Sequence, residues 1–395
     1  MSGSLNSIYD TVSFALYLHS KALMSLQEQA STGARVNRAS DSPSDAYRIL
    51  GLNSQERSLT SYIDNLTEVE STLEITSTIV QQMVSELAET RTQLTQVTSG
   101  LETETGRTVI AESVNDALEQ LVSLANTKHS NQYIFGGSDT TSAPYVVERT
   151  DGEITQVTYQ GSSDVRNVEV ASGLRSSALY VGQDIFASNS REEPVFTGDT
   201  GATAGSGTSS VCGDVWLTVT QDGSNYKLSI DDGASYVTVP EGGDSNTAVT
   251  DLRTGRVLYV DTTGLTGTGV ELVRVPGTYD VFSTLISIRD MLNNDRGLSD
   301  SQLSELQNSC ISAVEEVRNL LVQAGVSVGS RIGFLDTLKG NLEDMQLNTQ
   351  DEATQLSEAD IAQVAVDISR REILYEMSLS VAGKLMSMSL LDYIE

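Results

Sequence analysis

The chain has 395 residues and a formal net charge of −30, with 54 acidic residues against 24 Lys and Arg. Nucleic-acid binding needs clustered Lys and Arg, and no expected helix has a basic stripe, so the charge argues against nucleic acid and anionic membranes as partners. No stretch has the apolar length of a membrane span, and the N-terminus shows no cleavable secretory signal. The low aromatic content of 5% and the five prolines favour long helices in narrow bundles over a large globular enzyme.

Residues that could carry chemistry are few and scattered. Cys212 and Cys310 are the only cysteines, so a disulfide framework is excluded. Cys310 falls on a heptad core position, which predicts a buried thiol. The two histidines, His19 and His129, have no second ligand at metal spacing, and no hydrolase, P-loop or dinucleotide motif is present. We therefore expect no catalytic residue, no cofactor and no metal site.

The first expected helix covers residues 5–30 and has an apolar stripe with helical spacing. We expect His19 to pack within this stripe and Gly33 to end the helix. Residues 31–44 form a loop, and Pro43 suits the first turn of the next helix. The stripe is one half of a predicted assembly interface: Leu5, Ile8, Val12, Leu16, His19, Leu23 and Leu26.

The longest regular pattern is a heptad repeat between residues 52 and 101, which we call the rod seam. A second series three residues on runs from Tyr62 to Val97 and includes Thr76 and Thr90. A repeat of 3.5 residues predicts a left-handed supercoil, and fifty helical residues would be about 75 Å long. The rod seam consists of Leu52, Leu59, Leu66, Leu73, Val80, Leu87, Leu94 and Leu101.

Residues 100–106 interrupt the pattern, and a helix over 107–128 is expected to pack antiparallel to the first rod. Strand patterns follow. We expect one strand over 131–137, and a hairpin around Asp151-Gly152. A further strand is expected at 165–170, and a Gly/Ser/Thr-rich loop at 188–210. A meander then follows, with strands at 216–220, 226–230, 236–239, 256–261 and 270–275.

Helical spacing returns from Phe282 and continues through residues 303–324 and 328–345. Ser357 with Asp360 predicts a capping-box-like start for a closing helix. Residues 374–394 carry few charges, so this helix requires burial against other helices. Its apolar positions form the other half of the predicted assembly interface: Leu374, Met377, Val381, Leu385, Met388 and Leu391.

The predicted fold is therefore mainly α with a β insertion (α+β). We expect an elongated coiled-coil rod of N- and C-terminal helices with a small β domain at one tip. Residues 1–42 with 355–395 form the terminal helices, which are the expected assembly domain. Residues 43–185 with 277–354 form the rod domain with a β-hairpin, and residues 186–276 form the inserted β domain.

Three stretches carry a resemblance to a known family. They are LQEQASTGARVNRASDSPSDA (26–46), LANTKHSNQYIFGG (124–137), and VGSRIGFLDTLKGNLE (328–343) with the segment from Leu356 to the end. The chain resembles the flagellin superfamily, and within it the hook–filament junction proteins, over about residues 1–170 and 276–395. The Tyr-x-Phe-Gly-Gly stretch ending at Gly137 and the SLLDYI ending from Ser389 resemble the junction proteins more than flagellin.

The resemblance implies a structural subunit of the bacterial flagellum that serves motility, joining hook to filament by self-assembly of its terminal helices. It implies type III export without a cleaved signal, and an extracellular location. The implied partners are the hook-side junction protein, flagellin, further copies of the chain in a ring, and a cytoplasmic export chaperone. Two alternatives remain open: a flagellin that forms the bulk of the filament, and a stalked module that binds a surface through residues 186–276. An enzyme is disfavoured because no site offers a positioned nucleophile or base.

Overall fold

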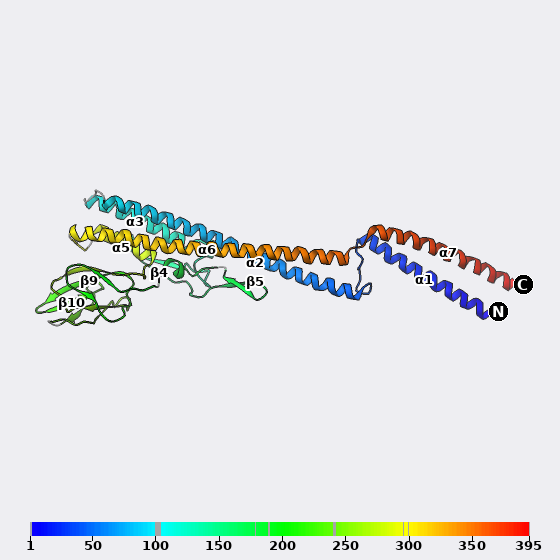
Figure 1. Cartoon of the computed structure of the whole chain (residues 1–395), viewed down its shortest axis with the longest axis horizontal. Helices are drawn as coiled ribbons and strands as arrows, with labels where there is room; N and C mark the ends of the chain where they lie inside the picture. Colours follow the sequence, from blue (N-terminus) through cyan, green and yellow to red (C-terminus); the bar gives the residue numbers. More distant parts are fainter. Residues whose placement is uncertain are drawn as a thin grey trace. The chain divides into compact units, whose positions relative to one another are not determined.

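The computed structural model describes residues 2–98, 104–177, 179–188, 190–239, 242–294, 296–298 and 300–394 (Figure 1). Long helices come from both ends of the chain and short strands from its middle, so the expected α+β class is confirmed. The chain divides into two compact units, one of residues 1–64 with 338–395 and one of residues 65–337. The three-part division expected from the sequence stays a prediction.

The first unit contains the paired terminal helices. Helix α1 (Ser2–Thr32) packs along α7 (Ile361–Ile394), and Figure 1 shows the two side by side. Helix α1 ends at Gly33, whose φ of 70° places it in the left-handed region, as the sequence predicts. Pro43 is the first residue of α2 (Pro43–Thr98), where its missing N–H costs no hydrogen bond.

The expected start of the closing helix is wrong in detail. Ser357 is the last residue of α6 (Asp300–Ser357) rather than a cap of α7. Asp360 caps α7 by itself, because its carboxylate accepts a hydrogen bond from the Gln363 amide at 3.1 Å. An Asp immediately before the first helical residue reaches that amide directly, so a Ser three residues earlier is not needed.

The second unit has a helical core formed by α2, α3 (Glu104–Ala125), α5 (Val281–Asn293) and α6. Helix α3 already includes Gly106, so the expected interruption extends too far, and residues 99–103 lie outside the described part. The core contains Met83 of α2, Leu118 of α3, Leu285 of α5 and Val317 of α6, all fully buried.

The rod seam lies on the buried side of α2 wherever its side chains are described. Leu52 is half-buried, and Leu101 lies outside the described residues. Thr76 and Thr90 of the second series are also buried, and each hydroxyl donates to a carbonyl oxygen one turn earlier, at 2.8 and 3.0 Å. These bonds explain how a heptad core accepts threonine. The buried seam residues are Leu59, Leu66, Leu73, Val80, Leu87 and Leu94.

Short paired strands and one short helix follow α3. The predicted hairpin is confirmed, with left-handed Asp151 (φ 54°) and Gly152 (φ 96°) at its turn. The single strand expected over 131–137 is wrong. Two-residue strands flank a left-handed turn at Ser130 and Asn131, and beyond them Gly136 forms an isolated bridge with Val181 rather than continuing the strand. The elements are β1 (Lys128–His129), β2 (Gln132–Tyr133), β3 (Tyr145–Thr150), β4 (Glu153–Tyr159), β5 (Asn167–Ala171), β6 (Leu174–Ser177) and α4 (Gly182–Phe186).

The remaining strands build two antiparallel sheets, in the orders β11-β10-β9-β14-β7 and β12-β13-β8. They are β7 (Val195–Thr197), β8 (Thr203–Ala204), β9 (Gly213–Asp222), β10 (Asn225–Ser229), β11 (Val237–Val239), β12 (Thr247–Thr250), β13 (Val257–Asp261) and β14 (Gly269–Val275). A separate apolar core, with Leu217, Leu228, Leu258 and Val273 fully buried, joins them.

Three expectations for this region need correction. The expected loop at 188–210 contains β7 and β8, which are too short to show an alternating pattern. The single expected meander is also wrong, because β14 pairs with β9 while β13 lies in the other sheet. The sequence pattern missed β12 entirely. In the described part of the chain, no helix has the length and apolar content needed to cross a membrane.

Candidate assembly surface on the terminal helices

The face on which α1 and α7 meet is thinly buried. On α1, the half-buried residues repeat at helical spacing and include Val12, Leu16 and Leu23. His19 lies on this face, with its Nδ1 atom 3.4 Å from an Arg371 guanidinium nitrogen. Among the described side chains of the two helices, Val364 alone is buried. Two helices with so small a shared core gain little stability from each other.

Helix α7 has a second apolar stripe that faces away from α1. Val366, Ile373, Met377 and Val381 follow one another at intervals of seven, four and four residues, so they share one side of the helix. Their exposed fractions are 62%, 59%, 61% and 49%. Val364 lies on the opposite side of the helix at this spacing. The outward stripe of α7, defined by these four exposed residues, therefore has no cover within the described chain.

Helix α1 has a matching outward stripe. It consists of four residues on one side of the helix, with 47–63% of each exposed: Phe14, Tyr17, Leu18 and Met24. They alternate with the half-buried positions of the α7-facing side. Soluble monomers rarely expose contiguous large apolar surfaces without a binding role. The outward stripes of α1 and α7 are therefore candidate surfaces for contact with other protein molecules.

The connection between the helices is fixed by the loop after α1. Backbone hydrogen bonds join Arg35 N to Ser357 O at 2.6 Å and Ala359 N to Gly33 O at 2.9 Å. The Arg35 guanidinium also donates to Leu356 O at 2.8 Å and to the Asp45 carboxylate at 3.0 Å. These bonds hold the loop of residues 33–42 against the link between α6 and α7. We call this set of contacts the junction.

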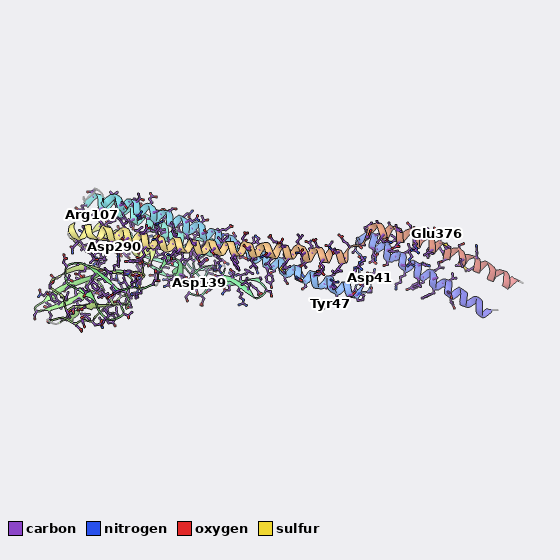
Figure 2. The ribbon with its side chains drawn as sticks, in the orientation of Figure 1. Asp41, Tyr47, Arg107, Asp139, Asp290 and Glu376 are labelled. Carbon is purple, nitrogen blue, oxygen red and sulfur yellow. The ribbon has the colours of Figure 1, made fainter. Side chains whose placement is uncertain are left out.

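Two carboxylates shape the junction. Hydrogen bonds from the Ser42 hydroxyl and from Arg35 lower the pKa of Asp45 below its usual value. Asp41 accepts hydrogen bonds from the amides of Asn37 and Arg38 at 3.1 and 2.8 Å, which closes the loop. Figure 2 labels Asp41 here, together with Tyr47 in the first turns of α2, which is 80% exposed.

The structure separates the predicted interface residues into three groups. Val12, Leu16, His19, Leu23 and Leu26 are half-buried on the α7-facing side of α1. Leu374, Met377 and Val381 are exposed. The third group, Leu5, Ile8, Leu385, Met388 and Leu391, has side chains outside the described part. The assembly role of all these residues stays a prediction.

Sequence reasoning missed the outward stripe of α1 and, on α7, Val366 and Ile373. A second stripe on the same helix was the available signal. In the sequence of α1, apolar residues occupy two sides of the helix, whereas one apolar side is enough for packing against a single partner helix. Arg35 was also missed, since nothing local shows that it reaches residue 356.

The described residues offer no group of three or more His, Cys, Asp or Glu that could hold a metal ion. His19 and His129 lie on separate elements, α1 and β1. Cys310 is buried, as its heptad position predicts, and burial raises the pKa of its thiol to about 12. Its Sγ atom lies 3.7 Å from the Met291 Sδ atom. The exposed apolar stripes are thus the feature of the terminal helices that suggests a function.

Part of the chain is similar in sequence to known proteins. Residues 4–140 match the model of the bacterial flagellin N-terminal helical region. The chain is 27% identical over 127 residues to flagellar hook-associated protein 3 of Escherichia coli K12, covering 32% of this chain and 40% of that protein. It is 26% identical over 175 residues to the Salmonella typhimurium LT2 protein of the same name, covering 43% of this chain and 53% of that protein. The matches thus span about half the length of these relatives or less.

A solved structure shares the fold. The crystal structure of flagellar hook associated protein-3 from Legionella pneumophila aligns with a TM-score of 0.53 and 20% identity, covering 78% of this chain and 98% of that one. A putative flagellar hook-associated protein from Vibrio parahaemolyticus aligns with a TM-score of 0.51 and 14% identity, covering 80% and 100% of the two chains. At these identities the alignments establish the fold alone.

Proposed function

This chain resembles the flagellin superfamily, and on that premise we propose that it is a structural subunit of the bacterial flagellum that joins the hook to the filament. The resemblance to hook-associated protein 3 supports the place in the flagellum. The mechanism is assembly rather than catalysis. In the proposed assembly, the outward stripes of α1 and α7 are covered by the terminal helices of neighbouring subunits.

One observation carries the proposal: the terminal helix pair exposes more apolar side chains than it buries. Among described side chains of the pair, Val364 is the single buried one, whereas Phe14, Val366 and Met377 are each more than 60% exposed. Burying a Val, Ile, Met or Phe side chain contributes about 1.5–3 kcal/mol. A stripe of four therefore offers several kcal/mol per subunit, which offsets the cost of ordering the helices on incorporation.

The proposed partners follow from a position between the hook and the filament. Copies of the chain form a ring, the hook-side junction protein lies on one side of it, and flagellin lies on the other. The chain is exported by the flagellar type III route without a cleaved signal and functions outside the cell. A cytoplasmic chaperone covers the apolar C-terminal helix before export, because α7 would otherwise expose its outward stripe to self-association.

A flagellin that forms the bulk of the filament is the second candidate. The match of residues 4–140 to the bacterial flagellin N-terminal helical region supports it. Copy number separates the two candidates. A junction subunit forms one short ring, whereas a filament subunit is repeated along the whole filament.

Deletion of residues 361–395 tests the assembly mechanism. We expect the truncated chain to be soluble, to retain the helical circular dichroism of α2 and α6, and to fail to join hooks or filaments in a pull-down and by electron microscopy. A chain that lacks α7 and still assembles would contradict the role given to the terminal helices.

A further inference from the structure

A small pocket lies among the strands of the second unit, away from the terminal helices. Its volume is about 210 Å³. It is lined by the residues at the start of β9, the turn after β10, the connection between β12 and β13, and Arg296 between α5 and α6. Figure 1 labels β9 and β10 in this region. The pocket includes Trp216 and three arginines, Arg253, Arg256 and Arg296.

The carboxylates of this pocket are already engaged. Both oxygens of Asp214 accept hydrogen bonds from the Arg274 guanidinium at 2.9 Å. Asp232 forms an ion pair with Arg296. Asp251 accepts hydrogen bonds from the Arg253 amide at 2.8 Å and from the Thr254 hydroxyl at 2.7 Å. Arginines thus neutralise Asp214 and Asp232, whereas Asp251 keeps its charge and fixes the connection between β12 and β13.

The positive charges of the pocket arginines are not all paired with carboxylates. Within the described residues, the guanidinium groups of Arg253 and Arg256 have no hydrogen-bond or ion-pair partner, although both line the pocket. Arg191 donates at 2.6 Å to the carbonyl oxygen of Val211, which lines the pocket, and has no carboxylate partner within the described residues. A chain with a net charge of −30 offers many acids to pair with. None of these three arginines forms an ion pair within the described residues, and the charge of Arg256 also acts on the Asp280 carboxylate. The pocket thus offers the guanidinium groups of Arg253 and Arg256 to an anion.

Guanidinium groups bind carboxylates through two parallel hydrogen bonds, and a pair of them selects an anion over a neutral ligand. The volume is below the range of about 300–1,000 Å³ typical of drug-sized ligands, so the ligand is small. The indole of Trp216 adds an apolar wall, with the Arg296 guanidinium 4.9 Å from its ring centre. Asp232 and Thr254 can accept hydrogen bonds from ligand hydroxyls.

We infer that this pocket binds a small organic carboxylate the size of one sugar ring, of the uronic acid type. Arg253 and Arg256 hold the carboxylate, and the ring lies against Trp216. This site is independent of the assembly role of the terminal helices. It would give the strand region a ligand of its own.

Trp216 provides a direct reporter because it is the only tryptophan in the chain. We would titrate the full chain with glucuronate at constant ionic strength and follow tryptophan fluorescence. Glucose serves as the neutral ligand of the same shape, and sulfate serves as the inorganic anion. We expect a saturable change with glucuronate, a response to glucose at least about tenfold weaker, and weaker binding of sulfate. Loss of one charge-assisted interaction of about 1.5–3 kcal/mol corresponds to a factor of ten or more.

Substitutions locate the site. The double variant Arg253→Gln with Arg256→Gln is expected to weaken glucuronate binding by about tenfold or more. Arg166→Gln removes an exposed arginine outside the pocket and should leave the titration unchanged. Circular dichroism of each variant confirms that it is folded. The inference is overturned if the fluorescence change is linear and unsaturable, if glucose or sulfate matches glucuronate, or if the double variant binds as tightly as the unaltered chain.

Discussion

The Arg35 guanidinium donates a hydrogen bond to the carbonyl oxygen of Leu356 at 2.8 Å, across 321 positions of sequence. This contact joins the loop after α1 to the last turn of α6, next to the link that leads into α7. The two terminal helices are therefore connected to the rest of their unit through one shared junction. The same guanidinium reaches Asp45 in the first turn of α2, so a single side chain ties its own loop to two helices, α2 and α6.

Removal of this side chain should loosen the junction. In Arg35→Met, we expect amide hydrogen exchange at Ala359 and at the substituted position to accelerate by about tenfold, because hydrogen bonds made by a charged group are lost. Arg38→Met is the matched control. Its ion pair with Glu28 is on the surface, with 70% of the Arg38 side chain exposed, and such pairs contribute about 0.2–1 kcal/mol. Equal acceleration in both variants would contradict the role given to Arg35.

The junction should also depend on pH through Asp45. The Ser42 hydroxyl and Arg35 hold its pKa below the usual value of 3.8. A carboxylate with a lowered folded-state pKa stabilises at pH values above 3.8, and this contribution is lost as the pH falls through the folded pKa. An NMR titration of the Asp45 carboxyl should therefore show a midpoint below 3.8.

Asp45→Asn should remove the same contribution. We expect the variant to be less stable than the unaltered chain near neutral pH, with a difference that shrinks as the pH falls below 3.8 and the carboxyl becomes protonated. Asp10→Asn, at an exposed position of α1, controls for the change in net charge. A stability difference for Asp45→Asn that is independent of pH would show that the hydrogen-bond geometry, rather than the charge, is what matters.

A charge in the outward stripe of α7 should block assembly and leave the free subunit intact. Met377 is 61% exposed, so Met377→Asp should change the melting temperature of the free subunit very little. On incorporation the new carboxylate would be buried without a partner, which costs several kcal/mol. We expect incorporation into hook–filament structures, counted by quantitative blotting, to fall by more than about tenfold.

Ala365→Asp is the matched control for that experiment. Ala365 is also exposed on α7, and its spacing places it about 80–120° around the helix from Val366, Ile373 and Met377, outside the outward stripe. It introduces the same charge, and incorporation should be nearly unchanged. Loss of monomer stability in Met377→Asp would mean that the outward stripe is already covered in the free subunit.

The two cysteines should differ in reactivity. Burial raises the pKa of the Cys310 thiol to about 12, so almost no reactive thiolate forms at about pH 8. Cys212 is half-buried and is the accessible thiol. A thiol reagent should therefore label one cysteine in the folded chain and two in denaturant. Cys212→Ala should abolish native labelling, whereas Cys310→Ala should leave it unchanged. Native labelling of Cys310 would contradict its place in the helical core.

The sequence pattern predicted the helical core well because its signal is long. Consecutive heptads from Leu59 to Leu94 leave little choice of which side of α2 is buried, and the structure buries that side. The hairpin at Asp151-Gly152 was predictable for a local reason, since both residues adopt left-handed backbone angles that few other pairs accept.

Other features depend on contacts distant in sequence. Strand β14 pairs with β9 rather than with β13. This pairing could not be predicted, because strands adjacent in sequence usually pair and the residues of β14 do not indicate which strand they bind. The hydrogen bond from Arg35 to Leu356 was unpredictable for the same reason, because it joins residues far apart in the sequence. The pocket at Trp216 needs four separate segments to come together. Its arginines are unremarkable in the sequence until the structure shows which acids are already paired.

The position of the chain on an intact flagellum tests the central proposal most directly. We would place an epitope tag at the exposed turn of Asp151 and Gly152, in a strain that expresses only the tagged chain, and locate it by immunogold electron microscopy. The account predicts a few gold particles confined to the boundary between hook and filament. Gold distributed along the whole filament would contradict it and identify the chain as a bulk filament subunit.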